Sequence, residues 1–192
     1  MLFDLFFKVW ELLHLSKKRA VGVWLRWFDK EEGFDGRTRE YTYDAGGILF
    51  AYSERDQTTL YERDSTGLLK RKLIERTGHG IVETRYAHDR LGRLTSVQNS
   101  HSAVRLHYDA LDNLIAEEQT ADLPDGYHYR SVYRHTYDVL GNRQTTTLPN
   151  GQEVAWLRYG SGHVHAMSLD RQPLFDFERD ALHRETARHY GV

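Results

Sequence analysis

The chain has 192 residues, 40% hydrophobic and 28% charged, and its 26 basic and 28 acidic side chains leave a formal charge of -2. This composition excludes a disordered chain and predicts a soluble globular type of protein with a sizeable buried core. The charge balance excludes a whole-chain field that would draw in nucleic acid or an acidic membrane. Because the chain has no cysteine, disulfides, thiolate metal sites and a cysteine nucleophile are excluded as well.

The first 32 residues differ from the rest and are predicted to form a separate, non-repeat segment. In residues 2–15, Asp4, Lys8 and Glu11 make a narrow polar stripe on an otherwise apolar helix, a basic cluster follows at 17–19, and 21–28 is expected to be a strand. The charges argue against a transmembrane span, and Asp4 and the lack of a small-residue cleavage site argue against a signal peptide. Three interpretations stay open: a cap over the end of a sheet, a helix on a membrane surface, or the product of a disrupted reading frame.

Residues 33–192 are built from about seven copies of one motif. The motif is seen in YTYDAGGIL at 41, YERDSTGLL at 61, YAHDRLGRL at 86, LHYDALDNL at 106, HTYDVLGNR at 135 and FERDALHRE at 177. A degenerate copy surrounds Tyr159 and Gly160, and the basic period is about 20 residues. A regular period of this kind indicates a repeat architecture.

The D-x-x-G core of the motif predicts a tight turn. An aspartate at the first turn position accepts hydrogen bonds from backbone N–H groups two or three residues later, and a glycine at the fourth position takes positive φ at little cost. Asp112 and His183 take the glycine's place in two copies. The predicted structural turn residues are Asp44, Gly47, Asp64, Gly67, Asp89, Gly92, Asp109, Asp138, Gly141 and Asp180.

The residues around each turn alternate as strands do, and Leu49, Leu69, Leu94 and Leu114 each stand five residues after an aspartate. Two strands of about six residues, one tight turn and one looser loop account for the period. We therefore predict an all-β protein: an antiparallel β-hairpin array that forms a curved, open sheet strip, with a short N-terminal helix.

The tyrosines of the motif are predicted to form an aromatic ladder along the sheet: Tyr41, Tyr43, Tyr61, Tyr86, Tyr108 and Tyr137. The main interpretation is structural. The alternative is a binding module whose aromatic face contacts carbohydrate or another surface polymer.

No catalytic, cofactor or metal site is predicted. His163-x-His165, with His183 and His189 in the same region, lacks the four firmly spaced ligands of a structural zinc site. In YGSGH at 159–163 the first glycine of a nucleophile elbow is replaced by Tyr159. A catalytic carboxylate is needed once or twice, not once in each repeat. The expectation is therefore a non-enzymatic protein, with an enzyme ranked third.

The recurring Y-x-Y-D-x-x-G-R/N-L unit resembles the YD repeat of Rhs (rearrangement hot spot) proteins. The stretches RYAHDRLGRLTSV at 85–97, YDVLGNRQTTTLPNGQ at 137–152 and YGSGHVHAMSLD at 159–170 resemble proteobacterial members in particular. The resemblance covers residues 33 to 192.

The resemblance implies a share in a β-sheet shell that encapsulates a toxic C-terminal domain, with other Rhs-core segments or the enclosed toxin as partners. It also implies a bacterial cytoplasmic origin before export by a secretion system. The RYYDP-like and DPxGL-like motifs of the family's core are not found, and the sequence ends at RHYGV. The chain is therefore expected to be a fragment of the repeat core, without the toxin itself.

Overall fold

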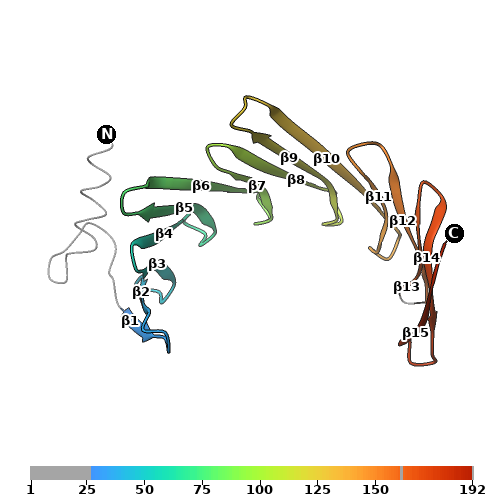
Figure 1. Cartoon of the computed structure of the whole chain (residues 1–192), viewed down its shortest axis with the longest axis horizontal. Helices are drawn as coiled ribbons and strands as arrows, with labels where there is room; N and C mark the ends of the chain where they lie inside the picture. Colours follow the sequence, from blue (N-terminus) through green and yellow to red (C-terminus); the bar gives the residue numbers. More distant parts are fainter. Residues whose placement is uncertain (1–26, 161, 192) are drawn as a thin grey trace. The chain divides into compact units, whose positions relative to one another are not determined.

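The computed structural model describes residues 27–160 and 162–191, which form fifteen β-strands and no helix. The strands follow one another through the sheet in chain order, from β1 to β15, and neighbours such as β1 and β2 or β2 and β3 pair antiparallel (Figure 1). The prediction of an all-β, antiparallel open sheet is confirmed. The predicted helix at 2–15 and residues 21–26 of the predicted strand lie outside the described residues.

Of the described residues, 27–83 belong to the first compact unit. Its strands are β1 (Trp27–Glu32), β2 (Thr38–Tyr43), β3 (Leu49–Glu54), β4 (Gln57–Arg63), β5 (Leu69–Arg76) and the start of β6 (Gly80–His88). Ala51 lies opposite Leu60, and Leu60 lies opposite Leu73, so the three side chains pack across neighbouring strands. Strand β1, predicted to lie outside the repeats, pairs with β2 along its whole length.

The second compact unit comprises residues 84–192. It contains the end of β6 and the strands β7 (Leu94–Gln98), β8 (Ser102–Tyr108), β9 (Leu114–Asp122), β10 (His128–Tyr137), β11 (Arg143–Thr147), β12 (Glu153–Tyr159), β13 (His163–Leu169), β14 (Gln172–Arg179) and β15 (Glu185–Tyr190). Its buried residues are polar. His135 and Thr146 are paired across β10 and β11, and their side chains share a hydrogen bond of 2.8 Å.

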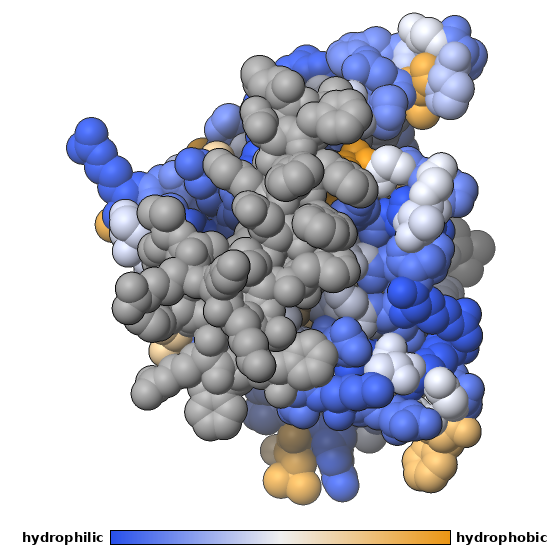
Figure 2. Space-filling view, turned by 90° about the vertical axis from the view of Figure 1, so that its left-hand side faces the viewer, coloured by the Kyte–Doolittle hydropathy of each residue, from blue (hydrophilic) through white to orange (hydrophobic). Residues whose placement is uncertain are grey.

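The prediction of a sizeable buried core is wrong for the described part of the chain. Only Ala51, Leu60 and Leu73 are buried apolar residues there. The reason is that each hairpin packs beside its neighbours in one layer, whereas a large core requires two packed layers. The residues coloured by hydropathy in Figure 2 are mainly hydrophilic, with apolar residues in isolated patches.

The turns lie at the two ends of the strands, which form two opposite edges along the sheet. The D-x-x-G turns join an even-numbered strand to the next odd-numbered one, for example β2 to β3 and β6 to β7. The remaining connections, such as residues 33–37 and 123–127, join odd to even strands. Because successive strands are antiparallel, each unit presents its D-x-x-G turns along one edge and its other loops along the opposite edge.

Candidate functional site

The edge that carries the D-x-x-G turns holds most of the predicted site residues. In the third repeat, one carboxylate oxygen of Asp89 accepts the backbone N–H groups of Leu91 at 2.9 Å and Arg93 at 3.0 Å. The N–H of Gly92 donates to the carbonyl of Asp89 at 3.1 Å, and Gly92 has a φ of 82°. The same aspartate-to-backbone contacts recur at Asp44, Asp64, Asp109, Asp138 and Asp180.

The fourth turn position takes positive φ in every copy. The value is 78° at Gly47, 87° at Gly67 and 79° at Gly141. It is 67° at Asp112 and 61° at His183, the two residues that replace glycine. The turn therefore imposes this conformation whichever residue stands there.

In four of the turns the second oxygen of the aspartate is bound by the side chain of the fifth turn residue, a contact that sequence reasoning missed; the first two turns have Ile48 and Leu68 there instead. The donors are Arg93 at 2.7 Å, Asn113 at 2.9 Å, Asn142 at 3.0 Å and Arg184 at 2.7 Å. This explains why arginine or asparagine stands at that position in the motif. The R/N position was visible in the motif, but not which atom it would contact.

These contacts favour the ionised form of the four carboxylates that accept them, because they lower the pKa of each. The side-chain amide of Asn113 lowers the pKa of Asp109, Asn142 does the same for Asp138, and Arg184 for Asp180. At Asp89 desolvation raises the pKa, but hydrogen bonds from Arg93 outweigh it and the pKa lies below its usual value. A carboxylate with a lowered pKa is a poor proton donor near neutral pH, so the geometry suits a turn former better than a general acid.

The residue just before the turn connects neighbouring repeats. The hydroxyl of Tyr108 donates to the carbonyl of Leu94 at 2.9 Å, and that of Tyr137 donates to the carbonyl of Leu114 at 2.8 Å. Each acceptor opens the return strand of the preceding repeat. In the last two repeats arginine replaces tyrosine and makes the equivalent contact: Arg158 donates to Arg143 and Arg179 to Val164, both at 3.2 Å.

The six predicted ladder tyrosines are all half-buried, but within the described residues none of their rings contacts another of the six. Tyr41 instead lies 5.4 Å from the ring of Tyr52, and Arg93 lies over the ring of Tyr108 at 4.7 Å. The reason is spacing: equivalent residues of successive hairpins are two strands, or about 10 Å, apart, whereas ring contacts span about 4.5–7 Å.

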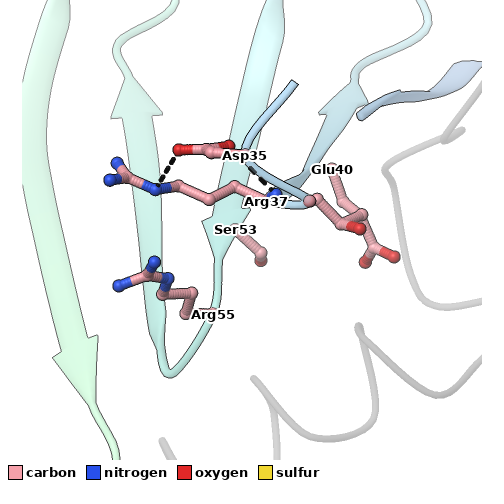
Figure 3. Close-up of a pocket in the computed structure, with 7 residues that line it drawn as sticks. Asp35, Arg37, Glu40, Ser53 and Arg55 are labelled. Atoms are coloured by element: carbon pink, nitrogen blue, oxygen red, sulfur yellow. Dashed lines mark hydrogen bonds and ion pairs between the residues drawn. The ribbon is translucent and has the colours of Figure 1, made fainter. Parts of the chain in front are cut away.

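Pockets open in each of the two units, and the one in the second unit adjoins the last turn. One of about 370 Å³ in the first unit is lined by Asp35, Gly36, Arg37, Thr38, Glu40, Ser53 and Arg55. Figure 3 shows Asp35 joined to Arg37, with the Arg37 and Arg55 side chains directed to one side and Glu40 to the other; the Asp35–Arg37 ion pair is 2.6 Å long. The backbone N–H of Arg37 lowers the pKa of Asp35, so this carboxylate too stays ionised.

The second cavity, of about 690 Å³, lies in the second unit beside Tyr159, His165 and His183. Between residues 27 and 191, leaving out residue 161, no group of three or more histidine, aspartate or glutamate side chains is placed to hold a metal ion. The same residues contain no helix long and apolar enough to cross a membrane.

The amino-acid sequence is similar to those of known toxin proteins. No protein-family model matches the chain. The chain is 34% identical over 180 residues to the double-stranded DNA deaminase toxin A of Burkholderia cenocepacia, covering 82% of this chain and 12% of that protein. It is 42% identical over 127 residues to the toxin protein Tse5 of Pseudomonas aeruginosa, covering 65% of this chain and 9% of that protein. The chain is a homologue of toxin proteins.

Solved structures agree on the fold. The crystal structure of TcdB2-TccC3 matches 95% of this chain with a TM-score of 0.72 at 11% identity, over 11% of its own chain. That of TcdB2-TccC3-TEV matches 96% with a TM-score of 0.71 at 10% identity, again over 11%. The chain thus spans about one tenth of the length of the proteins it resembles.

Proposed function

We propose that this chain is a YD-repeat segment of an Rhs-type toxin protein and forms part of the wall that encloses a toxic domain. The order of the strands carries the proposal: β1 to β15 follow one another in the sheet in chain order, and such a strip is extended by adding further hairpins at its ends. The homology with two toxin proteins and the shared fold with TcdB2-TccC3 support it.

The mechanism is containment. Each hairpin is joined to the next by backbone pairing and by a side-chain bond such as that from Tyr137 to the carbonyl of Leu114. Opening one hairpin therefore requires breaking contacts on both of its sides, which favours a wall that stays closed around its contents. In this proposal the partners are neighbouring repeat segments and the enclosed polypeptide, and the chain itself supplies no catalytic group.

The carbohydrate-binding alternative is not favoured. The half-buried ring of Tyr108 is covered by Arg93, and its hydroxyl donates to a backbone carbonyl, so this ring does not offer a free stacking platform.

The location proposed for the protein is the bacterial cytoplasm, followed by export through a secretion system. That part of the proposal rests on the family resemblance.

A chimera tests containment. Residues of Tse5 that match this chain are replaced by the chain's own, and the survival of the toxic portion under limited proteolysis is compared with parent Tse5. We expect equal protection, and we expect it to be lost when Gly92→Val and Gly141→Val are added to break two turns of the wall. A chimera that folds but leaves the toxic portion open to protease would overturn the proposal.

A further inference from the structure

The last two turns of the described chain touch through two histidines that both depart from the repeat. His183 stands at the fourth turn position of the last repeat, where glycine is usual, and His163 at the fifth position of the preceding repeat, where arginine or asparagine is usual. Their rings are stacked, with centroids 4.0 Å apart and an interplanar angle of 11°. Neighbouring turns are thus joined by an imidazole pair.

The pair is accessible to water and protons. The Tyr159 hydroxyl lies 3.2 Å from Nδ1 of His183, and the Tyr159 ring lies 5.8 Å from both stacked rings and 6.0 Å from His165. The cavity of about 690 Å³ opens beside Tyr159, His165 and His183. An Nδ1 without a proton accepts a hydrogen bond from the tyrosine hydroxyl, whereas an Nδ1 that carries a proton donates one, so the hydroxyl has to reorient.

Cations and carboxylates both surround the pair. The guanidinium of Arg179 donates to the carbonyl of His183 at 3.0 Å, and that of Arg158 donates to the carbonyl of Gly162 at 2.8 Å. The Asp180 carboxylate interacts with His183 but is shared with Arg184 at 2.7 Å, and Asp176 and Glu178 line the pocket beside His183. Glu178 bonds to His189 at 2.9 Å.

We propose that the His163–His183 stack is a pH-sensitive joint between the sixth and seventh repeats, closed when the rings are neutral and loosened when both are protonated. Histidine is the side chain that changes charge between pH 5 and 8. Two unit charges about 4 Å apart repel even when fully screened by water, and this repulsion corresponds to roughly a fivefold change in an opening equilibrium. The seventh hairpin therefore opens locally in acidic surroundings.

Two substitutions that restore the repeat's usual residues separate the stack from the fold. His183→Gly places the residue of the other turns at a φ of 61°, and His163→Asn places the residue found at the fifth position as Asn113 and Asn142. Each removes one imidazole. Glycine suits the positive φ at position 183, whereas an asparagine at position 163 keeps a polar side chain but has no turn aspartate to bind, because Tyr159 stands at the first position. His183→Asn serves if the glycine variant does not fold, because asparagine also tolerates positive φ.

The measurement is amide hydrogen exchange of residues 159–190 at pH 7.5 and 5.5, corrected for intrinsic exchange. On acidification we expect wild type to lose at least about fivefold more protection than either variant, and the double variant to behave like the single ones. Other titrating pairs, including His189–Glu178 and the buried His135, are present in all forms and cancel in the comparison. Equal losses in wild type and both variants, or greater protection of wild type at pH 5.5, would overturn the proposal.

Discussion

Replacing Gly67 with valine isolates the conformational demand of one turn. Gly67 has a φ of 87°, and a Cβ added there would meet no atom within 4 Å. The substitution therefore introduces backbone strain without a steric clash in the folded state. For a residue with a Cβ, the left-handed conformation costs about 1–2 kcal/mol of folded-state stability, and the cost for a β-branched residue lies at the upper end of that range.

The expected loss of unfolding free energy is about 2 kcal/mol for Gly67→Val, which corresponds to a melting temperature lower by roughly 4–8 °C for a protein of this size. Gly67→Asn is the matched control, because asparagine tolerates positive φ, and it should lose less than half as much. The same valine substitution at Gly92, with a φ of 82°, should behave alike. Thermal unfolding by circular dichroism and urea unfolding of all forms provide the comparison.

The interpretation of the turn is refuted if Gly67→Val melts within 1 °C of wild type, taken as roughly the error of such a melt. It is also refuted if Gly67→Asn is the less stable of the two variants. In either case the hydrogen bond that the Gly67 N–H donates to the carbonyl of Asp64, 3.0 Å long, would not depend on the left-handed conformation.

Four further outcomes are expected. Tyr137→Phe removes the bond to the Leu114 carbonyl and should lower the unfolding free energy by about 1 kcal/mol in urea, while the control Tyr129→Phe, 40% exposed, should show no measurable change. The Asn142 amide lowers the pKa of Asp138, so the stability that this carboxylate provides is complete above about pH 4, the pKa of an unfolded aspartate, and is lost as the pH falls through the lower folded pKa. The urea midpoint of Asp138→Asn should therefore change less with pH in that range than the midpoint of wild type. Superimposable plots of midpoint against pH would contradict this. Burial lowers the pKa of His135, so the contribution of its neutral ring to the unfolding free energy is complete above about pH 6.5 and is lost as the pH falls below that value. The unfolding free energy of His135→Gln should therefore fall less than that of wild type between pH 7 and 5. Because the outer edge of β15 pairs with no described strand, light scattering of the chain should give a mass that rises above 22.5 kDa with concentration, and a constant 22.5 kDa would count against an open edge.

The sequence predicted the hairpins well because the signal is local. An aspartate, a glycine three residues later and a leucine five residues later specify a turn and the start of the return strand, and repetition reinforces each copy. Leu69 and Leu94 both begin strands. The positive φ of His183 and Asp112 follows from the same local rule.

What the sequence did not predict depends on register between repeats. The bond from Tyr137 to Leu114 joins residues 23 apart, and the tyrosine motif alone favours ring stacking, which the spacing of two strands prevents. The stacked rings of His163 and His183 are 20 positions apart and were noted only as candidate ligands. Hydrophobic content suggested a core, but it does not say whether apolar residues are buried between two layers or spread over one.

The most direct test of the central claim is a cryo-EM map of the Tse5 chimera that carries this chain in place of the matching segment. The account predicts that the strands of the chain lie side by side in chain order from β1 to β15 and continue into a sheet formed by the rest of the chimera, with the D-x-x-G turns along one edge of each unit. A map in which the chain forms a separate globule, or pairs its strands in another order, would contradict the account.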